Sequence, residues 1–226
     1  MSKINIKSKS ELSLNWKNEG KTVPYNSAIK IMEQTVKDIY NKSSSELIWL
    51  LEHPSIYTCG TSYKKSDILN ITEVPIVETG RGGQITYHGP GQRIIYVMLN
   101  LNERNKDIKR YVKCLENWMI DSLKIIGLDS YTCKDRIGIW VNTPKGEAKI
   151  GAIGIRISRW ITYHGISINI NPDLSYYKNI IACGLKEFPI TSLQELGINI
   201  TAYEFDKIIK TTAKNYFLTY ENTINS

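Results

Sequence analysis

This sequence has more strand-like segments than helical ones, and that ratio limits the folds that the chain can adopt. Apolar residues recur at helical spacing in residues 25–42, 107–126 and 201–218. Runs rich in Ile, Val, Tyr and Trp, typical of strands, cover residues 47–51, 56–59, 94–99, 137–141, 149–157 and 161–170. Because the helices are too few to cross over between every pair of strands, the pattern predicts a mixed, partly antiparallel β-sheet flanked by helices, in an α/β (α+β) domain.

Local signals support these elements. Thr201 and Glu204 have the spacing of a capping box, and Gly127 follows the second helical pattern where a C′ glycine is expected. The run 94–99 is apolar without alternation, as in a strand covered on both faces. The run 161–170 alternates, which predicts that one side of the strand carries His164, Ile166, Ile168 and Ile170.

Length and composition narrow the class of protein further. The 226 residues suit one domain spanning 1–226. No apolar run approaches the roughly 18 residues of a membrane span, and the first twenty residues lack the apolar core of a secretion signal, so we expect a cytoplasmic protein. With 29 Lys and Arg against 22 Asp and Glu, the formal net charge of +7 favours acidic partners. An acidic protein suits it as well as nucleic acid, because the sequence has no basic run interleaved with aromatic residues.

Cysteine and histidine spacing argues against a metal centre. The four cysteines contain no C-x-x-C pair and are interpreted as reduced thiols. The three histidines lack the i, i+4 spacing that would place two imidazoles on one helical face.

A glycine-rich stretch, TGRGGQITYHGPGQR at residues 79–93, holds five of the chain's 15 glycines. It lies between the strand-like PIVE and the buried run 94–99, so we interpret it as a connection rather than an element. Bare glycine backbone lets a ligand approach, and Arg81 could hold a carboxylate or phosphate. The stretch matches neither the P-loop nor the G-x-G-x-x-G pattern. A ligand site and a set of structural turns remain equally open.

A second glycine cluster interrupts the run 149–157. Gly151 and Gly154 there predict a bulge or close approach of a ligand or another backbone. Lys149 shares strand parity with Ile153 and Ile155, which aims its ammonium toward the interior, although most lysines are solvated surface charges. A desolvated lysine loses basicity and can carry protons.

The other candidate groups have ordinary structural alternatives. Cys183, in a predicted loop, is either an inert buried thiol or, with a lysine ammonium beside it, a reactive thiolate. His88 and His164 share the local sequence TYHG and are either hydrogen-bonded core histidines or catalytic groups. His53 precedes a proline, which predicts a role in shaping an extended turn.

Taken in order and spacing, the segments RGGQITYHGPGQ, KIGAIG, YHGISININ and ACGL resemble the octanoyltransferases of lipoate biosynthesis, over about residues 20–200. The resemblance implies a fold like that of the biotin and lipoate protein ligases, with a tunnel for a medium-length acyl chain and no cofactor. It departs from the family at Ala182, where a proline is common, and at Tyr177, where phenylalanine is frequent.

The resemblance also implies roles for individual residues. Cys183 corresponds to the nucleophile that carries the acyl group as a thioester, and Lys149 to the residue that tunes this thiol. The implied substrate pocket consists of Arg81, Gly82, Gly83, Gln84, Ile85, Thr86, Tyr87, His88, Ala152, Ile153, Gly154, His164, Gly165 and Ile166.

The implied reaction moves an octanoyl group from octanoyl-acyl carrier protein to a lysine of lipoyl domains. The recipients would be the lipoyl domains of 2-oxoacid dehydrogenases and the glycine cleavage H protein, and we expect a monomer that binds neither nucleic acid nor membrane. Two alternatives remain at this point. One is an ATP-dependent lipoate or biotin protein ligase on the same fold, and the other is a basic, non-enzymatic adaptor that binds an acidic carrier protein or nucleic acid.

Overall fold

The computed structural model describes residues 14–184 and 187–217, and its helices form where the apolar spacing predicts them. They are α1 (Tyr25–Tyr40), α2 (Ile108–Ile125) and α3 (Ala202–Phe217). At α3 the predicted capping box is present, because the Glu204 amide donates to Thr201 Oγ1 and the Thr201 amide donates to Glu204. At α2 the Asp107 side chain caps the first turn, and Gly127 has the positive φ expected at C′. The predicted end of the third helix, residue 218, lies outside the described residues.

The strands form a large mixed sheet and a small one. In the large sheet the order is β1-β2-β6-β10-β9-β8-β7, with β1 parallel to β2 and the other neighbours antiparallel. The small sheet has the order β4-β3-β5. Their bounds are β1 Leu14–Thr22, β2 Glu46–Glu52, β3 Ile56–Cys59, β4 Ile76–Glu78, β5 Ile85–His88, β6 Gln92–Met98, β7 Tyr131–Cys133, β8 Arg136–Thr143, β9 Gly146–Ser158 and β10 Ile161–Asn169.

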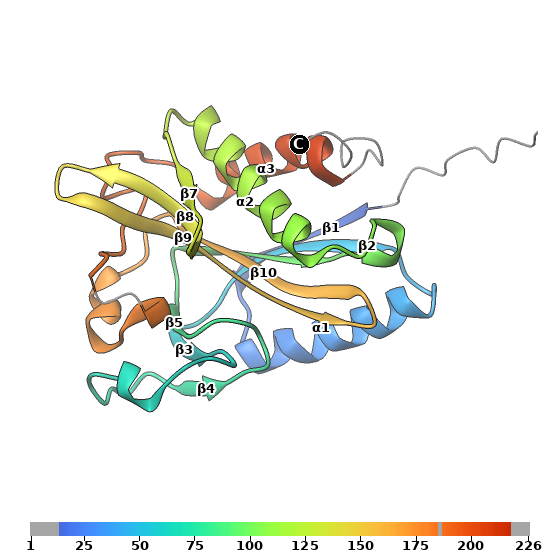
Figure 1. The fold of residues 1–226 in the computed structure, drawn as a ribbon, viewed down its shortest axis with the longest axis horizontal. Coiled ribbons are helices and arrows are strands. Elements are labelled where there is room, and N and C mark those ends of the chain that lie inside the picture. The colour runs from blue at the N-terminus through green and yellow to red at the C-terminus, as the bar shows by residue number, and fades with distance from the viewer. Residues whose placement is uncertain (1–13, 185–186, 218–226) are drawn as a thin grey trace, which may run out of the picture.

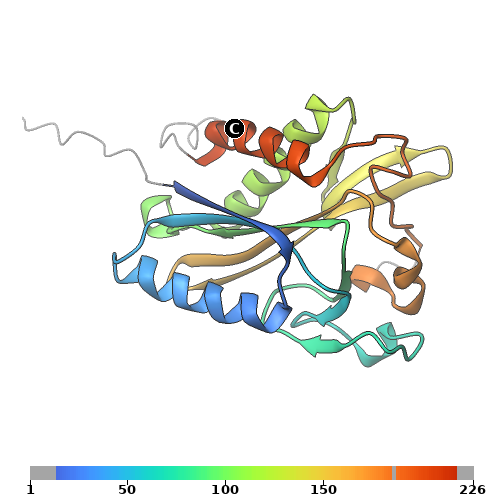
Figure 2. The same cartoon turned by 180° about the vertical axis from the view of Figure 1, so that it is seen from behind.

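The large sheet is covered on both faces, as Figures 1 and 2 show: α1 lies on one side with the small sheet beside it, and α2 and α3 lie on the other. Strand β6 is buried along its whole length. Its alternate residues enter two separate cores: Ile95 and Val97 pack with α2 and α3, while Ile94 and Tyr96 pack with α1. The predicted strand covered on both faces is thus confirmed.

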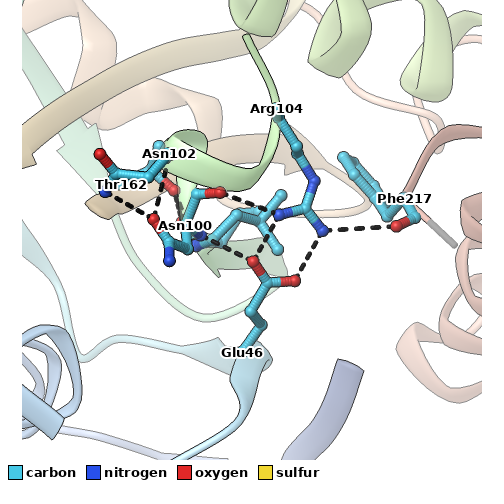
Figure 3. Close-up of polar contacts among 8 residues, drawn as sticks. Glu46, Asn100, Asn102, Arg104, Thr162 and Phe217 are labelled. Atoms are coloured by element: carbon cyan, nitrogen blue, oxygen red, sulfur yellow. Dashed lines mark hydrogen bonds and ion pairs between the residues drawn. The ribbon is translucent and has the colours of Figure 1, made fainter. Parts of the chain in front are cut away.

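A buried polar network ties β2 to the helical layer (Figure 3). The Glu46 carboxylate accepts from both terminal nitrogens of Arg104, with Nη2 at 2.6 Å, and from the Asn100 amide at 2.7 Å. Arg104 Nη2 also donates to the Phe217 carbonyl oxygen at 3.4 Å. This arrangement joins the first residue of β2 to the C-terminal end of α3.

Three strands lie where the sequence predicts none. Strand β1 is an exposed edge with few apolar residues, and β7 is only three residues long, so neither has a strong hydrophobic pattern. Strand β5 lies inside the glycine-rich stretch, so the interpretation of residues 79–93 as a connection alone is wrong. The short run ITYH pairs with β3 in antiparallel register, which the surrounding glycines conceal in the sequence.

The predicted alternation of β10 fails at His164. Its backbone is left-handed, with φ 58°, and its ring stacks on that of the preceding residue, Tyr163, at 5.1 Å between centroids. Tyr163 belongs to the core on the α1 side, whereas Ile166 and Ile168 belong to the core under α2 and α3. His164 therefore lies with the α1-side core and does not share a side with the isoleucines that follow it.

Candidate active site

A cavity of about 490 Å³ lies where β9 and β10 of the large sheet meet β5, the loop before β5 and the turn that holds Cys183. Its walls combine apolar side chains, such as Ile153 and Ile166, with polar and charged side chains, such as His88 and Lys149. Both Cys183 and Lys149 line it. The predicted pocket residues that also line it are Arg81, Gly82, Gly83, Gln84, Thr86, His88, Ala152, Ile153, Gly154, His164, Gly165 and Ile166.

Ile85 and Tyr87 do not line the cavity, although the resemblance places them in the pocket. Side chains alternate along β5, so Thr86 and His88 face the cavity while Ile85 and Tyr87 face the other way. Both are buried in the core of the small sheet with Tyr57. They pack behind the cavity wall and do not line the cavity itself.

Lys149 is buried, with 4% of its surface exposed, as its strand parity predicts. Its Nζ donates to the Ile137 carbonyl oxygen at 2.9 Å and lies 5.5 Å from the centre of the Trp140 ring. Gly138 makes room for the lysine, because a Cβ there would lie 2.4 Å from Lys149 Cε. No carboxylate in the described ranges forms an ion pair with this ammonium.

A β-bulge sets the position of Lys149. Ile139 pairs with Gly151 and the adjacent Trp140 pairs with Lys149, which leaves Ile150 as the extra residue on β9. The bulge predicted from the glycines of this strand is therefore confirmed. Close approach of another backbone is confirmed at Gly154, where a Cβ would lie 3.2 Å from the Gly82 carbonyl oxygen.

Cys183 lies in a tight turn (Ala182–Gly184) with a left-handed backbone, φ 56° and ψ 19°. Such a conformation is uncommon for a residue other than glycine, and strained residues of this kind cluster at active sites. Gly184 follows with φ 68°. The preceding residue anchors the turn, because the Ile181 amide donates to the Asp67 carbonyl oxygen at 2.7 Å. The thiol is half-buried.

The cavity joins Cys183 and Lys149, which are 34 positions apart in the sequence. Between these two described side chains the structure has no direct hydrogen bond, and the ammonium donates to the Ile137 carbonyl oxygen. The predicted pairing of this thiol with the lysine ammonium, which requires the two groups to come within hydrogen-bonding reach, stays a prediction. Direct contact between sulfur and ammonium requires one or both of these side chains to change position.

Arg81 is also buried, and it fixes the loop that precedes β5. Its Nη2 donates to the Thr58 carbonyl oxygen at 2.5 Å and to Thr58 Oγ1 at 2.8 Å, and its Nη1 donates to the Gly82 carbonyl oxygen at 3.0 Å. All of these acceptors are neutral, and burial lowers the pKa of the guanidinium. The Gly82 amide extends the anchor by donating to the Ile155 carbonyl oxygen of β9 at 3.0 Å.

Three histidines, His88 and His164 in the cavity wall and His53 behind it against Tyr96, are held neutral. Burial lowers the pKa of His53 to about 4. Burial lowers the pKa of His88 and of His164 to about 3 each, and the Arg81 charge acts in the same direction on both. These imidazoles are therefore uncharged near neutral pH.

His53 is a residue whose place near the site the sequence analysis missed. Its Nδ1 lies 2.6 Å from the Val23 carbonyl oxygen, and its Nε2 lies 2.7 Å from Tyr96 Oη. Because a carbonyl oxygen only accepts, Nδ1 carries the proton and Nε2 accepts from Tyr96. Tyr96 lines the cavity, so His53 orients part of its wall instead of only shaping a turn.

Other cavity-lining residues were also missed, and most carry no local signal in the sequence. They come from α1, from α2, from strands β6, β8, β9 and β10, and from loops and turns, and only folding brings them together. They include Tyr25, Ser62, Tyr96, Val112, Asp135, Arg136, Ile137, Ile155, Ser167 and Gly184.

Gln92 is the centre of a buried network behind the site. Its Nε2 donates to Asn169 Oδ1 at 2.8 Å and to Tyr177 Oη at 2.9 Å, and its Oε1 accepts from His88 Nδ1 at 2.6 Å. Asn169 in turn donates to the Thr191 carbonyl oxygen at 2.9 Å. Tyr177, one of the two departures from the family pattern, therefore has a satisfied hydroxyl.

The fold and this cavity define a known class of enzyme. Residues 24–214 match the family described as the lipoyl protein ligase A/B catalytic domain, and the chain belongs to this family. It is 49% identical over 196 residues to an octanoyltransferase of Rickettsia felis, a match that covers 85% of this chain and 94% of the relative. The chain is a transferase enzyme, which argues against the non-enzymatic adaptor.

Solved structures share the fold at low sequence identity. The bi-partite lipoate protein ligase of Thermoplasma acidophilum superposes with a TM-score of 0.65 at 14% identity, covering 90% of this chain and 84% of that one. The biotin protein ligase of Aquifex aeolicus, in complex with biotin and ATP, gives a TM-score of 0.53 at 14% identity, covering 92% and 74%. The fold predicted from the resemblance is confirmed. Among the described helices, none has the length and apolar character needed to cross a membrane.

Proposed function

We propose that the chain transfers an octanoyl group from octanoyl-acyl carrier protein to a lysine of a lipoyl domain, through a thioester on Cys183. The observation that carries this proposal is the shared cavity. A half-buried thiol in a left-handed turn and a buried lysine open onto one space with apolar walls. The similarity to octanoyltransferases supports the octanoyl group as the cargo.

In the first half-reaction the Cys183 thiolate attacks the thioester carbonyl of the carrier. The new C–S bond forms as the bond to the carrier sulfur breaks, and the carrier leaves as its thiol after taking one proton. Lys149 relays this proton. The acyl chain lies along Ile153, Ile155 and Ile166, which line the cavity.

In the second half-reaction the amine of the acceptor lysine attacks the Cys183 thioester. The C–N bond forms, the C–S bond breaks, and the proton lost from nitrogen passes through Lys149 to the departing sulfur. A thioester is converted to a more stable amide, so the transfer requires no nucleotide and no cofactor.

The proposed transfer needs two protein partners, a donor that carries the octanoyl thioester and an acceptor that offers a lysine. The net charge of +7 suits an acidic carrier protein as donor. The acceptors are lipoyl domains of 2-oxoacid dehydrogenases and the glycine cleavage H protein, and the enzyme acts as a monomer in the cytoplasm.

Intact-mass measurement tests the covalent step. Incubation with octanoyl-acyl carrier protein should add about 126 Da to the wild-type chain, the mass of a thioester-linked octanoyl group. Cys183→Ser should lose this adduct, because a serine hydroxyl is a much weaker nucleophile than a thiolate. Cys133→Ser is the matched control and should keep it. An adduct of full yield on Cys183→Ser would reject the assignment.

The same assay separates the transferase from a ligase. Octanoyl transfer to a lipoyl domain should proceed from the carrier thioester without ATP. If product forms only from free octanoic acid with ATP, the chain is a ligase, and the thioester mechanism is wrong.

A further inference from the structure

Gln84 has an unpaired polar atom beside the nucleophile. Its Oε1 is buried, and within the described part of the chain it accepts no hydrogen bond. The carboxamide rests on the residue that follows Cys183, since a Cβ on Gly184 would lie 1.7 Å from Gln84 Oε1. Gln84 also lines the cavity.

An unpaired buried acceptor is unfavourable, so its presence at a site indicates a donor that arrives with a ligand. The backbone of Gln84 is itself fixed, because its carbonyl oxygen accepts from the Gly60 amide at 3.3 Å. The Arg81 anchor holds the same loop against Thr58. The carboxamide is therefore held at the cavity wall with its oxygen packed against Gly184, and a turn of the side chain brings this oxygen to a ligand in the cavity.

An amide oxygen only accepts, so the ligand group must carry a proton on nitrogen or oxygen. The octanoyl chain and the thioester carbonyl have none. The acceptor lysine does, because its attacking nitrogen bears hydrogens and must reach the carbonyl carbon on Cys183. A donor on the carrier's arm lies beyond the sulfur, farther from the reacting carbon than the amine.

We propose that Gln84 Oε1 accepts a hydrogen bond from the amine of the acceptor lysine and orients it for attack on the Cys183 thioester. This inference rests on the proposed function and concerns only its second half-reaction. The amine nitrogen donates its lone pair to the carbonyl carbon while one of its N–H groups bonds to Gln84. The second proton leaves toward Lys149, the C–S bond breaks, and the products are the amide and the Cys183 thiol.

The test isolates the second half-reaction. Octanoyl-enzyme is prepared from wild type and from Gln84→Met, which keeps the length of the side chain and removes the acceptor. Loss of the adduct is followed by intact mass after adding an unmodified lipoyl domain. We expect Gln84→Met to transfer about 10- to 100-fold more slowly than wild type. Its rate of acyl-enzyme formation should stay within about threefold of wild type.

Gln84→Glu keeps an acceptor oxygen and should transfer from the preformed octanoyl-enzyme within about threefold of wild type. Gln194→Met, an exposed glutamine away from the cavity, is the matched control and should behave as wild type. Transfer by Gln84→Met at the wild-type rate would overturn the inference, as would equal slowing of both half-reactions. Absence of any adduct on the wild-type chain would instead reject the proposed function.

Discussion

The buried position of Lys149 depends on two neighbouring residues of β8. Gly138 leaves the space that its methylene groups fill, and the Ile137 carbonyl receives its ammonium. The side chain is almost fully buried, and no described carboxylate pairs with its charge. At the scale of single residues, the candidate site thus depends on a glycine that neither the sequence patterns nor the resemblance single out.

Gly138→Ala should slow octanoyl transfer, because the added Cβ displaces Lys149. The added Cβ would lie 2.4 Å from Lys149 Cε and 2.7 Å from the Gly151 carbonyl oxygen, so the lysine must move. We expect octanoyl transfer to fall at least about 10-fold, toward the level of Lys149→Met, with a changed pH–rate profile. Gly20→Ala is the control, because nothing lies within 4 Å of a Cβ there. Wild-type transfer by Gly138→Ala, with an unchanged pH profile, would contradict this role.

Among the elements, α3 is attached to the large sheet by a buried ion pair. Asp206 of α3 accepts from Arg93 of β6, with 2.8 Å to Nε and 2.7 Å to Nη2, and both side chains are almost fully buried. Asn18 of β1 completes the group by accepting from Arg93 Nη2 at 2.7 Å. Strands β1 and β6 and helix α3 therefore meet at one set of charges.

Asp206→Ala should destabilise the protein by about 3–5 kcal/mol, because it leaves the Arg93 charge buried without a partner. The free energy of unfolding, measured by urea denaturation, checks this. Glu19→Ala removes the more exposed Lys17–Glu19 pair and should cost less than about 1 kcal/mol. Equal losses in the two variants would show that burial does not govern the strength of these pairs.

For the molecule as a whole, the three buried histidines link stability to pH. Their pKa values are about 4 for His53 and about 3 for His88 and His164, below the ordinary value of 6.5. Below pH 6.5 the unfolded chain therefore binds more protons than the folded one. The contribution of these groups to stability is complete above about pH 6.5 and is lost as the pH falls toward their folded values.

The free energy of unfolding should accordingly be lower at pH 5 than at pH 7, by up to about 2 kcal/mol for each histidine. Urea denaturation at the two pH values measures the difference. His164→Gln should show a smaller difference than wild type, whatever its stability at pH 7, since it has one titrating group fewer. Identical unfolding free energies for the wild-type chain at both pH values would contradict the buried, neutral state of these imidazoles.

The sequence by itself determined the periodic elements. The three helices and the six strongly apolar strands follow from spacing that reflects which face is buried, and capping residues mark the ends of helices. Strand parity also placed Lys149 in the interior, and the glycines of β9 indicated its bulge. The motifs around Cys183 and Lys149 carried the resemblance, and with it the fold and the family.

Tertiary structure alone decided which of these residues meet. The sequence gives no sign that Gly138 makes room for Lys149, that His53 holds Tyr96, or that Gln84 lies against Gly184. The sequence also does not show that β5 points Ile85 and Tyr87 away from the cavity, because the glycines around this short strand obscure its pattern. Local periodicity reports the burial of one segment at a time, whereas a site is made by contacts between segments far apart in the chain, and only the packed fold fixes those contacts.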